Sequence, residues 1–185
     1  VRIGLYGGTF DPIHNGHLHV MQQLFSLDIV DELILVPAGE PWLRTRAPFA
    51  SGDDRLAMAK LAIKGLPENI QSRVMVSDVE VSRLGPTYTI DTVQELQAGR
   101  PEAKWLLIVG TDAYESIEQW HRSAELQALI EILVVAREGK GLDIQALPIS
   151  ASQVRAQIHT NPVEVKDIPE SVWTYIKERR LYARK

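Results

Sequence analysis

Short apolar segments rich in β-branched residues recur along the chain at wide intervals. Each is almost entirely apolar instead of alternating between apolar and polar positions, which is typical of a strand buried on both faces of a parallel sheet. The pattern therefore predicts six mostly parallel strands. They lie at Ile3–Tyr6, Leu33–Val36, Val74–Val76, Leu106–Val109 and Ile132–Ala136, with a weaker candidate at Ala146–Ile149.

The stretches between these segments have the periodicity of amphipathic helices. Leu18, Met21 and Leu24 fall on one stripe of a helix over residues 17–27. The same pattern predicts helices around 56–63 and at 91–97, 113–119, 152–159 and 170–180. Pairs with capping-box spacing mark three helix starts: Ser51 with Asp54, Ser150 with Gln153, and Asp167 with Glu170.

Alternation of strands and helices predicts an α/β fold, a doubly wound and mostly parallel sheet with right-handed crossovers. The length of 185 residues fits a single domain over 1–185, whose last part, from about 150 to 185, is helical. In an open parallel sheet, ligands bind beyond the carboxyl ends of the strands, where the strand order reverses. Candidate chemistry is therefore expected directly after the apolar segments.

Composition excludes several classes of protein. No apolar run approaches the ~20 residues that span a bilayer, so we expect no membrane partner. The 20 basic and 24 acidic residues leave a net charge of −4, which does not provide the basic footprint of a nucleic-acid-binding protein. The chain has no cysteine, which removes disulfides, thiolate metal sites and cysteine nucleophiles. Without a recognisable signal peptide, a cytoplasmic location is expected.

The first predicted strand runs into a glycine-rich loop, Gly7–His17, and an amphipathic helix follows. The loop has neither the Gly-Lys-Ser/Thr of a Walker A motif nor the GxGxxG of a dinucleotide-binding fingerprint. Two adjacent glycines, Gly7 and Gly8, still allow backbone N–H groups to approach a phosphate closely. The helix start adds a positive dipole, so the segment predicts a site for a small anionic ligand.

Three histidines, at positions 14, 17 and 19, lie in this segment. His14 and His17 have the spacing that shares one face of a helical turn, whereas His19 points elsewhere. The pair is compatible with a metal site that would need Asp11 as a further ligand, with purely structural hydrogen bonding, or with phosphate binding. The neighbouring glycine loop favours phosphate, because ring N–H groups stabilise charge that develops on its oxygens.

Two motifs carry a family resemblance. The segment Gly8–Pro12 with His14-x-Gly16-His17 resembles the first signature of the HxGH nucleotidyltransferase superfamily, and Ile149–Arg155 resembles its second. Over nearly its full length the chain is similar to the bacterial nicotinate-nucleotide adenylyltransferase branch. Further segments support this: Gly85–Thr89, Gly110-x-Asp112, Trp120 and the ending Pro169–Tyr182.

The resemblance implies a Rossmann-like fold and adenylyl transfer from ATP to nicotinate mononucleotide, a step of NAD biosynthesis. Its implied catalytic residues are His14, His17 and Arg155. Its implied ATP-binding residues are Gly7, Gly8, Thr9, Phe10, His14, His17, Gly110, Asp112, Ile149, Ser150, Ser152 and Arg155. It places nicotinate mononucleotide on Thr89 and Trp120, with Arg44 or Arg46 on its phosphate. Mg²⁺ is expected to accompany ATP, held by substrate and water and not by a protein metal site.

Each of these residues also has an ordinary structural interpretation. Ser150 with Gln153 forms a capping box, and a capped helix start still binds anions. Arg155 has the position of a common surface arginine, Asp112 could cap the helix that follows it, and Trp120 could be a core residue like Trp105 and Trp173. Departures from the family pattern occur at Ala151, in the loop 41–44 and in a short segment 137–149.

Three other functions compete with this interpretation. Phosphopantetheine adenylyltransferase has the same chemistry, but commonly has threonine in place of the first histidine, where this chain has His14. A non-catalytic nucleotide-binding module would need the glycine loop but not both histidines. A Rossmann dehydrogenase would need an acidic residue at the end of the second strand, where Val36 is followed by Pro37.

Overall fold

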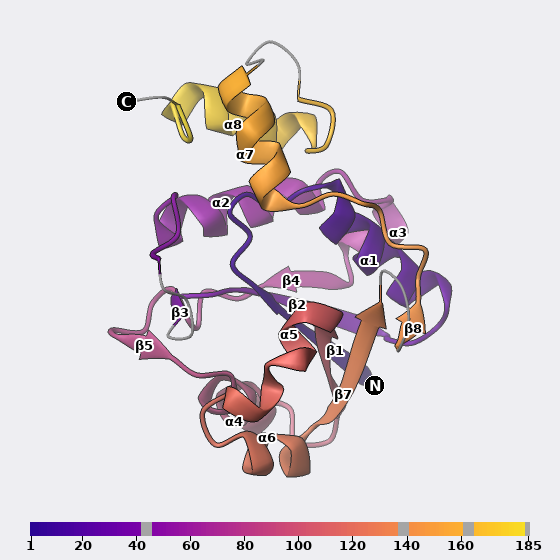
Figure 1. Cartoon of the computed structure of the whole chain (residues 1–185). Helices are drawn as coiled ribbons and strands as arrows, with labels where there is room; N and C mark the ends of the chain where they lie inside the picture. Colours follow the sequence, from indigo (N-terminus) through magenta and orange to yellow (C-terminus); the bar gives the residue numbers. More distant parts are fainter. Residues whose placement is uncertain (42–45, 137–140, 161–164, 184–185) are drawn as a thin grey trace.

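The computed structural model describes residues 1–41, 46–136, 141–160 and 165–183. Its centre is a six-stranded sheet in which all the ladders are parallel (Figure 1). The strands in spatial order are β4 (Val74–Val76), β2 (Glu32–Pro37), β1 (Arg2–Gly8), β6 (Lys104–Gly110), β7 (Glu131–Ala136) and β8 (Leu142–Asp143). The predicted doubly wound parallel sheet is confirmed.

The strand order reverses at the centre of the sheet. The chain moves outward from β1 through β2 to β4, then returns to β6 on the other side of β1 and moves outward again. β1 and β6 pair directly, with Leu5 opposite Leu107 and Tyr6 opposite Ile108. Their carboxyl ends, at Gly8 and Gly110, therefore border the crevice in which this class of fold binds ligands.

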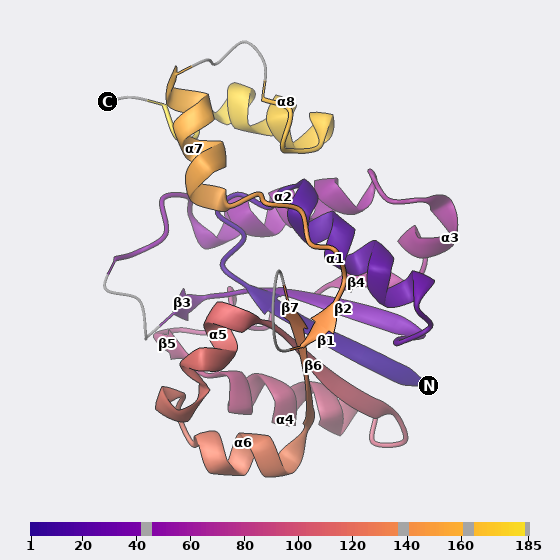
Figure 2. The same ribbon diagram turned by 45° about the vertical axis from the view of Figure 1, so that its right-hand side comes forward.

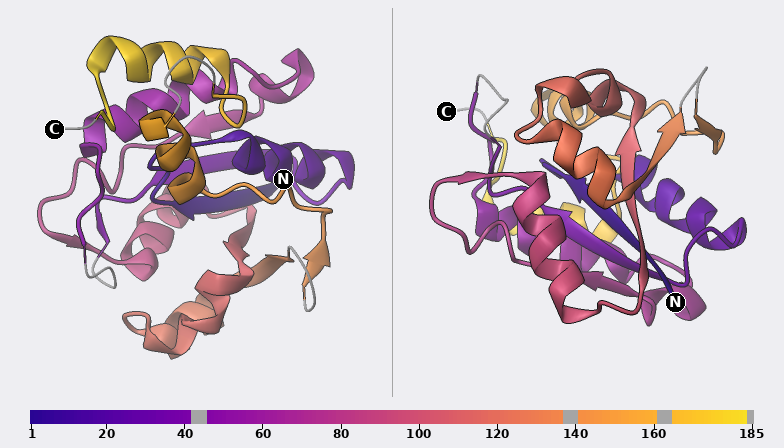
Figure 3. Two further views of the ribbon diagram at one scale, coloured as in Figure 1. Left: turned by 45° about the horizontal axis from the view of Figure 1, so that its top comes forward. Right: turned by 90° about the horizontal axis from the view of Figure 1, so that it is seen from below.

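Helices cover both faces of the sheet. They are α1 (Asn15–Ser26), α2 (Gly52–Ile63), α3 (Glu68–Gln71), α4 (Thr89–Gly99), α5 (Thr111–Glu115), the 3₁₀ helix η1 (Ile117–Gln119), α6 (Ser123–Leu129), α7 (Ala151–Thr160) and α8 (Glu170–Arg179). Figure 2 shows α1 and α2 on one face, with α7 and α8 beyond them, and α4, α5 and α6 on the opposite face. The view from below in Figure 3 shows this second group lying across the sheet.

The strands have apolar residues at successive positions because both faces are buried. In β2, Leu33 and Leu35 pack into the core beneath α1 and α2, whereas Ile34 and Val36 pack into the core beneath α4 and α6. Trp105 and Trp173 are 7% and 8% exposed and belong to these two cores, as the packing interpretation predicted.

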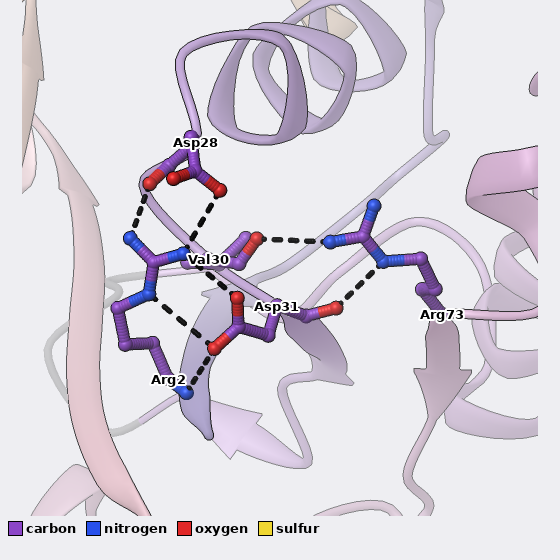
Figure 4. A network of polar contacts seen from close by, with 5 residues as sticks. All are labelled: Arg2, Asp28, Val30, Asp31 and Arg73. Carbon is purple, nitrogen blue, oxygen red and sulfur yellow. Dashed lines mark hydrogen bonds and ion pairs between the residues drawn. The ribbon is translucent and has the colours of Figure 1, made fainter.

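A polar network closes the amino end of the sheet, away from the glycines. Arg2 forms ion pairs with Asp28 (2.9 Å) and Asp31 (2.7 Å), and Arg73 donates to the carbonyls of Val30 and Asp31 (Figure 4). The hydrogen bonds from Arg2 hold the pKa of the Asp31 carboxyl well below its usual range. Since these residues satisfy one another, the network is structural, and the opposite end of the sheet is the end to search for a site.

The predicted sixth strand is wrong. The strand that pairs with β7 is β8, with Leu142 opposite Val135, and the segment 146–149 forms no strand. Gln145 has a φ of 48°, so the chain turns out of the sheet before it reaches this segment. The ring of His19 also forms a hydrogen bond with the carbonyl of Ile144 at 2.8 Å, which holds the segment that leaves the sheet against α1. This bond confirms that His19 points away from the pair His14 and His17.

Two local predictions also need correction. The helix predicted over 113–119 is split into α5 and η1. At the junction the Ser116 hydroxyl donates to the carbonyl of Ala113, and such a side-chain bond competes with the regular helix pattern. Asp167 does not cap α8, whose first turn follows Pro169; its carboxylate accepts a hydrogen bond from Gln157 instead. The pattern also missed α3, α6 and the short pair β3 (Glu40–Pro41) and β5 (Pro86–Thr87).

Candidate active site

Three glycines border the crevice between β1 and β6. A Cβ atom added to Gly7 or Gly110 would meet no other atom within 4 Å, so both backbones are open to a ligand. At Gly8, by contrast, a Cβ atom would lie 2.8 Å from the ring of Phe10. Phe10 itself is buried with a φ of 49°, an uncommon backbone conformation for a residue with a side chain. The glycine loop is therefore tightly packed on one side and open on the other.

A cavity of about 460 Å³ lies on the open side. Its walls bring together residues predicted for ATP (Gly7, Gly8, Thr9, Gly110 and Asp112) and residues predicted for nicotinate mononucleotide (Thr89 and Trp120). Its volume lies within the range of small-molecule sites. Asp112 is exposed in the first turn of α5, where no side-chain hydrogen bond caps the helix, and it is one of the residues that line this cavity.

The end of the cavity predicted for the acceptor contains an indole ring in a defined orientation. Trp120 is half-buried, and its Nε1 donates to the hydroxyl of Ser116 at 3.4 Å. Trp120 packs against the core beneath α4 and α6 and also lines the cavity. Its position is therefore compatible with both a packing role and a ligand-binding role. Thr89 is the first residue of α4, next to Tyr88, whose ring stacks on His121 with centroids 4.1 Å apart.

The two histidines of the first motif lie together at the start of α1. Their rings stack with centroids 3.7 Å apart, and the edge of the Phe10 ring lies against His17. The backbone N–H of His14 donates to Nδ1 of His17 at 3.1 Å. Because Nδ1 accepts this bond, the proton of the neutral ring is on Nε2, the form that donates to a phosphate oxygen. His14 is only 4% exposed and His17 is half-buried, so packing fixes the first ring and contacts with His14 orient the second.

Arg155 links the second motif to the first. From α7 its Nη1 donates to the backbone carbonyl of Asp11 at 2.5 Å, and its Nη2 donates to the Ser152 hydroxyl at 3.1 Å. Its guanidinium also lies 4.4 Å from the centroid of the Phe49 ring. These contacts replace the simple surface-arginine interpretation, because they join segments 144 positions apart in the chain.

Ser150 and Ile149 complete the start of α7. The Ser150 hydroxyl accepts from the N–H of Gln153 at 3.3 Å, and the Gln153 side chain accepts from the N–H of Ser150 at 2.9 Å, so the predicted capping box is present. Ile149 lies beside the first motif, since a Cβ atom on Gly16 would lie 3.6 Å from it. The start of this helix therefore faces the histidine segment.

The two arginines expected on the acceptor phosphate are not brought into the site by any described contact. Arg46 is exposed and does not line the cavity. Arg44 and Trp42 lie outside the described residues.

Asp11 is not arranged as a metal ligand. Its Oδ2 accepts from the N–H of Phe49, and its Oδ1 accepts from the N–H of Ala50 and the hydroxyl of Tyr182, at 2.7 to 3.0 Å. Within the described ranges, no group of three or more His, Cys, Asp or Glu side chains is placed to hold a metal ion. The geometry therefore favours the phosphate interpretation of the histidines over a metal site that includes Asp11.

Two charged residues that no sequence pattern predicted for the site support the cavity walls. Arg55 is 2% exposed and donates to the carbonyls of Thr9 (2.9 Å), Gly39 (3.3 Å) and Ala50 (3.3 Å). Arg55 lies one turn before Ala59 on the apolar stripe of α2, and this position could have predicted that its side chain is buried. Glu80 lines the cavity and accepts from Thr87, Thr92 and the N–H of Gly39. No local pattern marks Glu80.

A doubly wound sheet with open glycines at its switch point is compatible with a nucleotidyltransferase. Comparison with known proteins identifies the class. A family model described as cytidylyltransferase-like matches residues 5–168, so the chain belongs to that family. It is 36% identical to a probable nicotinate-nucleotide adenylyltransferase of Acidothermus cellulolyticus, over 99% of this chain and 95% of the relative. A protein of the same name from Synechococcus is 35% identical over 98% and 94%. Within the nucleotidyltransferases, the chain belongs to the nicotinate-nucleotide adenylyltransferase family.

Solved structures share the fold. The Plasmodium falciparum nicotinic acid mononucleotide adenylyltransferase complexed with NaAD superimposes with a TM-score of 0.78 at 22% identity, covering 98% of this chain and 97% of the other. A Vibrio parahaemolyticus protein, described as a putative nicotinate-nucleotide adenylyltransferase, has a TM-score of 0.72 at 18% identity. Among the described residues, no helix is long and apolar enough to cross a membrane.

Proposed function

We propose that this chain transfers the adenylyl group of ATP to nicotinate mononucleotide, producing nicotinate adenine dinucleotide and pyrophosphate in NAD biosynthesis. A phosphate oxygen of the mononucleotide attacks the α-phosphorus of ATP. As that P–O bond forms, the bond from the α-phosphorus to the bridging oxygen breaks and pyrophosphate leaves. One observation carries this proposal: Arg155, from the second motif, donates a hydrogen bond to the carbonyl of Asp11, in the loop that leads to His14 and His17.

His14 and His17 stabilise the charge that develops on the transferred phosphoryl group. The proton of the neutral His17 ring is on Nε2, because its Nδ1 accepts from the backbone of His14. A donor that is oriented before the reaction pays no reorganisation energy when the charge appears. The stacked rings and the buried Phe10 provide this fixed orientation.

The remaining donors hold the triphosphate. Gly7 and Gly8 offer backbone N–H groups at the end of β1, and Arg155 offers a planar set of N–H donors from α7. Ser150 and Ser152 lie at the start of α7, where the helix dipole favours an anion. No nucleophilic side chain is required, since the acceptor phosphate is itself the nucleophile.

We propose that Mg²⁺ enters with ATP, held by phosphate oxygens and water. The saturated Asp11 carboxylate supports this arrangement, because Mg²⁺ usually retains several waters and binds substrate phosphates. When bound, the ion neutralises negative charge on the phosphates. The protein residues then orient the two polyanions and stabilise the charge that develops on the transferred group.

Nicotinate mononucleotide occupies the end of the cavity lined by Thr89 and Trp120. The indole face stacks on the flat pyridine ring, and the donors at the start of α4 bind the ring carboxylate. The names of the relatives support this acceptor. Arg44 or Arg46 binds the acceptor phosphate in this proposal.

We further propose that residues 1–185 act as one domain in the cytoplasm. Apolar residues of α7 and α8 share a core with those of α1 and α2, so the part that carries the second motif packs against the part that carries the first.

Pyrophosphate release from ATP and Mg²⁺ in the presence of different acceptors tests the proposal. We expect release with nicotinate mononucleotide and none with phosphopantetheine. A preference for phosphopantetheine would assign the chain to a different branch, and binding of ATP without release for any acceptor would favour a nucleotide-binding module. His17→Ala serves as the control for contaminating activity.

A further inference from the structure

The carboxylate of Asp11 joins three parts of the chain. It is 3% exposed and accepts from the Tyr182 hydroxyl at 2.7 Å, from the N–H of Phe49 at 2.7 Å and from the N–H of Ala50 at 3.0 Å. Tyr182 follows the last helix, so the end of the chain contacts the first motif over a separation of 171 positions. We call Asp11, Phe49, Ala50 and Tyr182 the Asp11 cluster.

The Asp11 cluster supplies two of the contacts that orient Arg155. The backbone carbonyl of Asp11 accepts from Nη1 of Arg155, and the guanidinium lies over the Phe49 ring. Phe49 is 68% exposed, so burial does little to fix its position; its backbone is held through the N–H that donates to Asp11. Any shift of the Asp11 carboxylate therefore moves both surfaces against which Arg155 rests.

The chain conformation around Tyr182 is unusual. Arg180 and Tyr182 have φ values of 54° and 60°, a conformation uncommon for residues other than glycine. These two left-handed residues direct the Tyr182 hydroxyl back to Asp11 after α8 ends. Burial raises the pKa of this hydroxyl above its ordinary value, so it remains a hydrogen-bond donor throughout the neutral range.

We propose that Tyr182 and Asp11 are positioning residues for Arg155, so that the C-terminal segment after α8 completes the phosphate-binding half of the site. This inference rests on the proposed function. Tyr182 does not contact the substrate in this proposal; it acts through the Asp11 carboxylate.

A matched pair of tyrosines provides the test. Tyr175 also belongs to the C-terminal part and donates its hydroxyl to a buried carboxylate, Asp54, at 2.9 Å. Within the described ranges, the side-chain partners of Asp54 are Ser51, Tyr175 and Arg179, and none of the three belongs to the first motif. We expect Tyr182→Phe to lower kcat about ten-fold, equivalent to about 1.4 kcal/mol, with the KM for nicotinate mononucleotide unchanged. Tyr175→Phe should lower thermal stability without changing kcat.

A double-mutant cycle separates positioning from general damage. In an Arg155→Lys background, Tyr182→Phe should lower kcat by less than about two-fold, because the planar group that it positions is already absent. Tyr175→Phe should show no coupling to Arg155→Lys. An undiminished effect of Tyr182→Phe in that background, or equal effects of the two tyrosine variants on kcat, would overturn the inference.

A further variant covers the case in which Tyr182→Phe does not fold. Phe49→Leu removes an exposed ring while it keeps the backbone N–H that binds Asp11, and it should show the same coupling to Arg155→Lys. Additive effects would again overturn the inference. If the wild-type protein releases no pyrophosphate with nicotinate mononucleotide, the proposed function has failed, and this result is distinguishable from a failure of the positioning role.

Discussion

The two halves of the site are built differently. On the phosphate side, His14 and Asp11 are 4% and 3% exposed, and the hydrogen bonds of the Asp11 carboxylate join residues that are 38 to 171 positions apart in the chain. On the acceptor side, Trp120 and Thr89 are half-buried along an open cavity. There Trp120 is oriented by Ser116, only four positions before it.

This difference matches the chemistry proposed for each half. Charge develops on the transferred phosphoryl group during the reaction, and donors stabilise it best when they are fixed in advance. A pyridine ring that stacks on an indole undergoes no chemical change, so its binding tolerates a looser pocket. Substitutions on the phosphate side should therefore act mainly on kcat, and those on the acceptor side mainly on KM.

The largest effect is expected at His17. His17→Ala removes a preorganised donor, which typically lowers turnover by about 10²–10³-fold. The affinity for ATP should change far less, because the proposed function gives the triphosphate several other donors. Steady-state kinetics together with direct measurement of ATP binding check this. A variant with near-normal turnover would contradict the role given to the histidine pair.

Arg155 comes next. Arg155→Ala should reduce kcat/KM for ATP by about 10–100-fold, since a hydrogen bond to a charged group contributes about 1.5–3 kcal/mol. Arg155→Lys retains the charge but loses the planar donors, so its loss should be smaller. Kinetics of both variants at varied ATP concentration measure the difference. Unaltered kinetics in both would return Arg155 to the role of a surface residue.

The acceptor side is tested by the ratio of the kcat/KM values for two acceptors. The wild-type protein should prefer nicotinate mononucleotide over nicotinamide mononucleotide by about ten-fold or more in kcat/KM, because donors near Thr89 bind a carboxylate more strongly than a neutral amide. Trp120→Ala should raise KM for both acceptors and leave their ratio nearly unchanged, since stacking does not distinguish them. A collapse of the ratio in this variant would show that Trp120 itself selects the acceptor.

The smallest effect concerns stability in acid. Burial opposes ionisation of Asp54, but hydrogen bonds from Ser51, Tyr175 and Arg179 outweigh it and hold its pKa below the ordinary value. A lowered pKa in the folded state stabilises the protein above the unfolded-state pKa of about 3.9, and this contribution is lost as the pH falls through the folded-state pKa. Denaturant unfolding between neutral pH and about pH 3 should show a shallower loss for Asp54→Asn than for the wild type. Equal slopes would contradict the prediction.

Much of the phosphate side was predictable because its signals are local. Gly7, Gly8, His14 and His17 lie within one strand–helix junction, and strand alternation places that junction at the carboxyl edge of a parallel sheet. The helix cap at Ser51 and the capping box at Ser150 were also confirmed, since a cap depends on residues three positions apart. The predicted helix cap at Asp167 was wrong, because the Asp167 carboxylate accepts a tertiary hydrogen bond from Gln157.

The sequence by itself determined five of the six strands of the sheet, most of the longer helices and the two motifs, because apolar periodicity and short spacings specify local structure. Only the tertiary structure decided how the motifs meet: that Arg155 binds the carbonyl of Asp11, that Tyr182 binds its carboxylate, and that buried Arg55 gathers three loop carbonyls. These bonds join polar groups far apart in the chain. Such groups find partners only because packing of the two cores removes them from water, where an unpaired group would be unfavourable.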